Sequence, residues 1–116
     1  MQIFGTHKSA DTRAALRFFS ERRVRTHFVD LNEKAASPRE LERFARKFGV
    51  PAMIDRGSKR FAALGLVTAQ LTDTRWLEKL GSEPLLLRQP LVRCQNELTI
   101  GAAPETWKTW VTKPSG

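Results

Sequence analysis

The sequence has very little cysteine and histidine. Cys94 is the single cysteine among 116 residues, and only two histidines are present. One thiol cannot form an intramolecular disulfide, and these residues make no Cys/His cluster with the spacing of zinc ligands. We therefore expect no disulfide framework, no bound metal and a cytoplasmic location.

The sequence also lacks a long apolar run. No segment approaches the roughly 18 consecutive apolar residues that are needed to span a membrane. The chain reaches polar Thr6 and Lys8 too soon after Met1 for the apolar stretch of a signal peptide. We expect a soluble protein without membrane contact, and 116 residues fit one domain covering 1–116.

What the chain does have is positive charge. Lysine and arginine outnumber aspartate and glutamate by 20 to 12, which gives a formal net charge of +8. Such a charge attracts anions of several kinds, and its sign alone does not choose among them. The basic residues form short clusters without a tail, and no helix-turn-helix or aromatic-interleaved basic strand accompanies them. We interpret them as a solvated surface and do not expect direct binding to nucleic acid.

The first third of the chain predicts a βαβ unit. Gln2–Gly5 is a short apolar run that ends at glycine, and a helical pattern follows from Asp11. The β-branched and aromatic segment Arg25–Leu31 comes next and predicts a second strand. Because the helix is long enough for a crossover, we expect the two strands to be parallel.

A group of helices follows, as an insertion at about residues 37–82. Ser37 and Pro38 predict the start of the first helix, with Glu40 completing a capping box and Gly49 at its end. The pattern predicts two shorter helices as well. These cover Ser58–Leu64, ended by Gly65, and about Asp73–Leu80, ended by Gly81.

The last part of the chain predicts a β-hairpin and a helix. Leu85–Arg88 and Pro90–Cys94 lead to a polar turn at Gln95 and Asn96, and Leu98–Gly101 forms the return strand. Pro104 opens a final helix whose indoles, Trp107 and Trp110, should pack on the sheet. The complete order is βαβ, helical insertion, ββα, which is an α/β fold of the thioredoxin-like type.

Four segments in this order resemble the arsenate reductase (ArsC)/Spx family. Phe4–Arg13 is similar to the family's first loop, in which a cysteine stands at the position of Ser9. Phe61–Leu66 is similar to its aromatic-x-x-Leu-Gly-Leu motif. Leu86–Arg93 resembles its arginine-proline segment, and Gly101–Trp107 resembles the glycine-proline start of its last helix. The resemblance implies a thioredoxin-like oxidoreductase fold over nearly the whole chain.

The resemblance also implies an anion site. In the family, a thiolate attacks the arsenate oxyanion, and a helix N-terminus and arginines lower the pKa of that thiol. By resemblance, the oxyanion would be held by the loop around Ser9 and Ala10, and by Arg88. Two more arginines are candidates: Arg56, one position from the best alignment, and Arg93, which would substitute in space for an arginine lost at Thr99. The resemblance further predicts a cis peptide bond at Pro90.

The nucleophile itself is missing, because Ser9 stands in its place. A serine hydroxyl needs a general base, and His7 is the one nearby candidate. An alkoxide cannot form the sulfur intermediates that reduction by glutathione and glutaredoxin requires. The second cysteine of a Cys-x-x-Cys pair is also missing, since that position holds Thr12. We therefore expect impaired or absent arsenate reduction and no redox switch in this loop.

Cys94 is the one remaining thiol. At the end of an apolar strand, a free cysteine usually acts as a small buried hydrophobe, and we favour that interpretation. The alternative is a displaced nucleophile or resolving thiol, with its pKa lowered by Arg93 and Arg88.

Two functions remain open. The first is a redox-family protein, expected to be monomeric, that binds an oxyanion or a thiol compound, with glutathione as a possible co-substrate and no bound cofactor. The second is a non-catalytic regulator that, like Spx, acts through a protein partner such as RNA polymerase.

Overall fold

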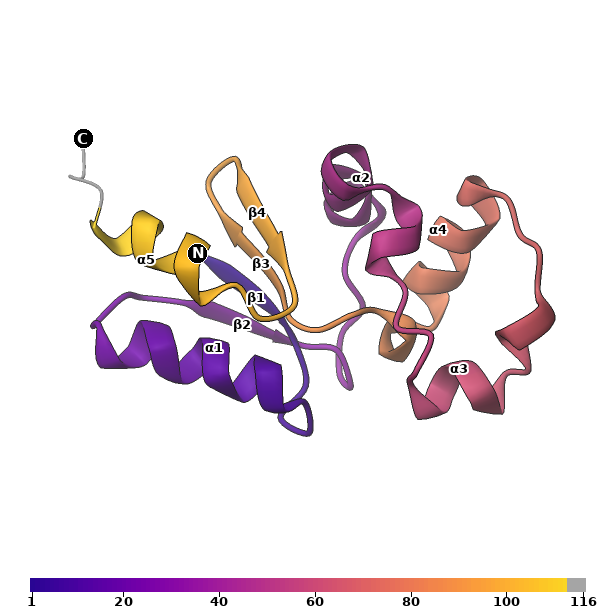
Figure 1. Cartoon of the computed structure of the whole chain (residues 1–116), viewed down its shortest axis with the longest axis horizontal. Helices are drawn as coiled ribbons and strands as arrows, with labels where there is room; N and C mark the ends of the chain where they lie inside the picture. Colours follow the sequence, from indigo (N-terminus) through magenta and orange to yellow (C-terminus); the bar gives the residue numbers. More distant parts are fainter. Residues whose placement is uncertain (113–116) are drawn as a thin grey trace. The chain divides into compact units, whose positions relative to one another are not determined.

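The computed structural model describes residues 1–112, which form two compact units (Figure 1). The first unit combines Met1–Asp30 with the chain from Gln89 onward, and the second unit is Leu31–Arg88. The predicted helical insertion at 37–82 falls inside the second unit, whose bounds are wider at both ends. Within residues 1–112, no helix is both long and apolar enough to cross a bilayer.

A four-stranded mixed sheet organises the first unit. Its order is β2-β1-β3-β4, in which β1 and β2 are parallel and the other neighbours are antiparallel. The predicted βαβ unit and hairpin are therefore both confirmed. The strands are β1 Gln2–Gly5, β2 His27–Asp30, β3 Leu91–Cys94 and β4 Glu97–Ile100.

Two helices, α1 (Ala10–Glu21) and α5 (Pro104–Thr112), pack on one face of this sheet (Figure 1). Ile3 and Val92 are paired across β1 and β3, so their side chains share that face. Phe19 of α1 and Trp107 of α5 meet there with ring centroids 5.6 Å apart. Trp107 is 2% exposed and Trp110 8%, which confirms that both indoles pack against the sheet.

The second unit is helical. Its helices are α2 (Pro38–Phe48), α3 (Lys59–Ala63) and α4 (Asp73–Ser82), joined by the short 3₁₀ turns η1 (Val50–Met53) and η2 (Leu66–Thr68), with η3 (Pro84–Leu86) after α4. Each helix begins at a hydroxyl side chain that accepts a first-turn N–H. These bonds are 3.2 Å at Ser37, 3.1 Å at Ser58 and 3.2 Å at Thr72.

The expected stop at Gly81 is wrong, because α4 continues through it to Ser82. Glycine inside a helix costs only about 1 kcal/mol relative to alanine, which does not end a helix by itself. The stop comes from Pro84, since a proline disfavours the helical region for the residue before it. Glu83 accordingly has φ −128° and ψ 74°.

Leu85–Arg88 also differs from the prediction, because it does not join the sheet. Leu85 and Leu86 lie in η3, and Leu87 forms an isolated antiparallel bridge with Ile54. The Asp55 N–H donates to the carbonyl of Leu86 at 2.8 Å, and the Arg88 N–H donates to that of Met53 at 2.9 Å. This segment therefore satisfies its backbone within the second unit.

An ion pair fastens α3 to the end of α4. The guanidinium of Arg60 donates to both carboxylate oxygens of Glu83, at 2.8 Å from Nε and 2.9 Å from Nη2. These hydrogen bonds lower the pKa of Glu83, so the pair contributes stability above the unfolded-state pKa of a glutamate and loses it as pH falls through the lower folded value.

We expect Glu83→Gln to reduce the free energy of unfolding at pH 7 and to have a smaller effect near pH 3. Urea titrations of both proteins at the two pH values measure this difference. Because the side chains are 42% and 27% exposed, 1 M NaCl should also shrink the pH 7 effect. An effect that is equal at both pH values would contradict the ionic role.

Candidate active-site loop

The loop Thr6–Ser9, called the Ser9 loop below, connects β1 to α1. Ser9 is the N-cap of α1, with φ −77° and ψ 121°. Its Oγ accepts the Thr12 N–H at 3.1 Å, and its own N–H donates to the carbonyl of Thr6 at 3.1 Å. Ala10 is the exposed first residue of the helix. The Ser9 hydroxyl therefore serves the helix terminus as a cap.

His7 is not positioned as a base for Ser9. Its ring lies 4.8 Å from that of Phe28, centroid to centroid, and its carbonyl accepts a hydrogen bond from Arg13 Nη1 at 2.7 Å. Among residues 1–112, no hydrogen bond joins the His7 imidazole to the Ser9 hydroxyl. Serine activation of the Ser-His type has no geometric support in this loop.

Gln89 is the side chain that holds the Ser9 loop from the other end of the sequence. Its Oε1 accepts the Thr6 N–H at 2.7 Å and the Thr6 hydroxyl at 2.9 Å. The Thr12 hydroxyl lies 3.4 Å from the same oxygen. Because only the oxygen of a carboxamide can accept an N–H, these contacts also fix which way the group is turned. Thr6 is 4% exposed and Thr12 is fully buried.

Sequence reasoning missed Gln89 and chose its neighbour Arg88. The signal was available, because Gln89 directly precedes Pro90 whereas Arg88 is two positions before it. The Gln89–Pro90 peptide bond is cis, as predicted. The carbonyl of Pro90 accepts the Gly101 N–H at 2.9 Å.

Close packing at Gly5 completes the loop. A Cβ built on Gly5 would lie 2.7 Å from Thr12 Cγ2 and closer still to Thr12 Oγ1. Real side chains do not approach this closely, so a residue larger than glycine would displace Thr12 and its contact with Gln89. Gly5 is thus required by the packing of α1 on β1.

Arg93 lies at the far end of the sheet from the Ser9 loop. It pairs with Gln2 in the β1–β3 register, whereas the loop begins after Gly5. Three residues of strand separate these positions by about 10 Å. Arg93 Nε donates to the carbonyl of Gln95 at 2.9 Å, and its Nη1 lies 3.4 Å from Gln2 Oε1. The first unit therefore does not bring Arg93 together with Ser9.

Thr99 has a structural partner. It is 6% exposed, and its Oγ1 accepts the indole N–H of Trp107 at 2.9 Å. A threonine here satisfies the buried indole that anchors α5, and it supplies no positive charge to the site.

Arg56 and Arg88 both belong to the second unit and are both exposed. The Ile54–Leu87 bridge brings their two segments side by side. The Arg88 N–H donates a hydrogen bond to the carbonyl of Met53, and Arg56 lies two residues after Ile54. The guanidinium of Arg56 lies 5.6 Å from the Phe61 ring and 5.7 Å from the Trp76 ring. These aromatic faces hold the cation while leaving its N–H donors available.

Cys94 is half-buried at the end of β3 and packs against the core formed around Trp107 and Phe19. This placement agrees with the interpretation as a small hydrophobe. In the described part of the chain, no three His, Cys, Asp or Glu side chains gather closely enough to hold a metal ion.

The sequence model of the ArsC family matches residues 4–110. The chain belongs to the ArsC family. The match covers the Ser9 loop, the cis proline and most of α5, so the predicted resemblance and the thioredoxin-like fold are confirmed. No curated protein matches the sequence significantly.

Solved structures agree in fold. The YffB protein superposes with a TM-score of 0.86 at 17% identity, covering 96% of this chain and 98% of that one. An arsenate reductase from Vibrio cholerae gives 0.76 at 24% identity, covering 91% and 94%. A putative arsenate reductase from Yersinia pestis gives 0.79 at 20% identity, covering 93% and 97%. At these identities, the likeness establishes the ArsC fold alone.

We expect Gln89→Met to destabilise this ArsC-family chain by about 1–3 kcal/mol, because the buried Thr6 N–H and hydroxyl lose their acceptor. Gln89→Glu keeps an oxygen acceptor at pH 7, so it should lower the free energy of unfolding by less than Gln89→Met does. Urea unfolding of the three proteins measures the difference. Equal losses in both variants would show that the hydrogen bonds of Gln89 do not hold the loop.

Proposed function

We propose that this ArsC-family protein binds a small oxyanion or a thiol compound at the Ser9 loop without the thiolate chemistry of arsenate reduction. The observation that carries the proposal is the Ser9 hydroxyl. It occupies the position that the resemblance assigns to the nucleophile, and it caps α1 by accepting the Thr12 N–H at 3.1 Å.

The N-terminus of α1 supports the proposed binding of an anion. The first-turn N–H groups of Ala10 and Asp11 precede the first intrahelical hydrogen bond, so they are available to an anion. The partial positive charge of the helix terminus favours the same ligand. Arg88 and Arg56 are the charged donors that the resemblance implies, and both residues are exposed.

The loss of reductase chemistry follows from the properties of oxygen and sulfur. Reduction by glutathione proceeds through attack of a thiolate on a sulfur atom and a mixed disulfide. A serine hydroxyl forms neither species, and the position of His7 provides no base that would ionise it. Cys94 packs at the end of β3, where it pairs with Glu97 in the hairpin register.

An arsenate-dependent NADPH oxidation assay coupled through glutathione and glutaredoxin tests both halves. We expect the protein to be silent and Ser9→Cys to turn over, because the thiol then stands at the helix N-terminus. Cys94→Ala, alone and combined with Ser9→Cys, is the matched control and should change neither result.

Two other outcomes of this assay would contradict the proposal. Turnover by the unmodified chain would contradict the proposal, and its loss in Cys94→Ala would assign the reaction to that thiol. If Ser9→Cys remains silent and no oxyanion perturbs the amide resonances of Ala10 and Asp11, the loop is not an anion site.

A second candidate is the non-catalytic regulator that acts through RNA polymerase. The observation in its favour is the basic face of α2, where Arg39, Arg43 and Arg46 line a shallow hollow of about 380 Å³ together with Glu42. A stable complex with purified RNA polymerase that is lost in Arg39→Glu/Arg46→Glu would favour this function over the first.

A further inference from the structure

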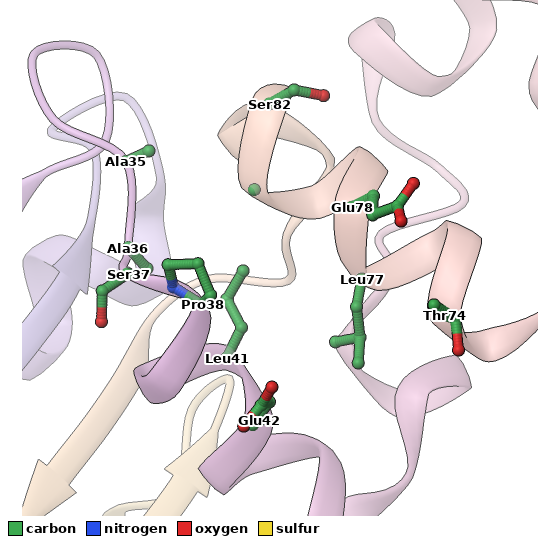
Figure 2. Close-up of a pocket in the computed structure, with 11 residues that line it drawn as sticks. Ala35, Ala36, Ser37, Pro38, Leu41, Glu42, Thr74, Leu77, Glu78 and Ser82 are labelled. Atoms are coloured by element: carbon green, nitrogen blue, oxygen red, sulfur yellow. The ribbon is translucent and has the colours of Figure 1, made fainter.

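An open groove runs between α2 and α4, wholly within the second unit (Figure 2). Its volume is about 760 Å³, and it contains none of the residues proposed for the anion site. Pro38 and Leu41 line it from α2, and Leu77 lines it from α4. Figure 2 shows the side chains of Leu41 and Leu77 directed toward the space between the two helices. The surface that lines the groove is therefore mainly apolar.

Gly81 keeps this groove open. It lies inside α4 and lines the groove, and a Cβ built on it would meet only Leu41 Cδ1, at 3.9 Å. That distance is an ordinary contact, so the packing of α4 on α2 does not require a glycine. Alanine would make the helix more stable by about 1 kcal/mol. At Gly81, the chain therefore leaves a space in the groove that a larger side chain could fill.

Two carboxylates flank the apolar surface, Glu42 on α2 and Glu78 on α4 (Figure 2). Both are exposed, and neither forms an ion pair with any residue among 1–112. Other glutamates do have basic partners, such as Glu83 with Arg60 and Glu105 with Lys108 at 3.8 Å.

The neighbouring basic face of α2 offsets part of the charge of Glu42, because Arg39 and Arg46 lie beside it. Glu78 is on the other helix and outside that hollow.

We propose that this groove docks a segment of a partner protein that inserts large apolar side chains between α2 and α4 and places lysine or arginine against Glu42 and Glu78. Amphipathic helices bind two-helix grooves in this way, with apolar anchors at i, i+3, i+4 and i+7. The charged side chains that line the groove are the carboxylates of Glu42 and Glu78, so a basic segment complements it in charge. This surface is independent of the Ser9 loop.

Fluorescence anisotropy with a defined probe tests the proposal. The probe is a fluorescein-labelled amphipathic helix of leucine and lysine, and its control has glutamate at every lysine position. We expect saturable binding of the lysine probe to the full chain and none of the glutamate probe. Glu42→Gln/Glu78→Gln should weaken binding about fivefold, as expected for two exposed ion pairs. Gly81→Leu should weaken it at least tenfold by filling the groove.

Two control variants separate docking in the groove from changes in net charge and in helix stability. Glu21→Gln/Glu105→Gln changes the net charge by the same amount on exposed residues of the first unit, and it should leave the affinity unchanged. Gly81→Ala adds one carbon at an uncrowded position, and it should raise thermal stability with less than a twofold change in affinity.

Three results would overturn the proposal. The first is no binding of the lysine probe at millimolar protein. The second is binding that Glu42→Gln/Glu78→Gln and Gly81→Leu leave unchanged. The third is concentration-dependent dimerisation in sedimentation that Gly81→Leu abolishes, because the occupant would then be a second copy of this chain.

Discussion

The Ser9 loop depends on one hydrogen-bonded group, the carboxamide of Gln89. Its oxygen accepts both the N–H and the hydroxyl of Thr6, and Thr12 approaches the same atom from α1. These contacts connect Gln89, just before β3, to the loop after β1 and to the first turn of α1, which are 83 and 77 residues away from it in the sequence. Because Thr6 and Thr12 are buried, their hydrogen bonds are not replaced by water, and the loop has one well-defined arrangement.

The same arrangement fixes the N-terminal turn of α1 against the end of β1 in this ArsC-family chain. The cis peptide bond at Pro90, the N-terminus of α1 and the packing of Thr12 over Gly5 are all present. Ser9 caps α1 through its hydroxyl, and Gln89 provides a neutral side chain where the proline segment meets the loop. The loop is therefore maintained by a helix cap, by close packing at Gly5 and by hydrogen bonds to Gln89.

Local sequence patterns predicted the features that are set by residues close together in the sequence. The cap at Ser37 and the hairpin turn at Gln95 depend on neighbours in sequence, so their positions were predicted closely. Two errors arose where another residue overruled the local signal. Pro84 ends α4 after the glycine that was expected to end it, and the bridge to Ile54 pairs Leu87 within the second unit.

The sequence by itself determined the family, the βαβ–insertion–ββα order and the absence of a cysteine at position 9, since these depend on residue identity and spacing. Only the tertiary structure decided which side chains meet. Antiparallel pairing of β3 with β1 places Arg93 beside Gln2, a full strand length from the loop, and the cis bond at Pro90 follows the residue that contacts Thr6. Such partners are set by strand register and by long-range hydrogen bonds, which no local pattern of residues encodes.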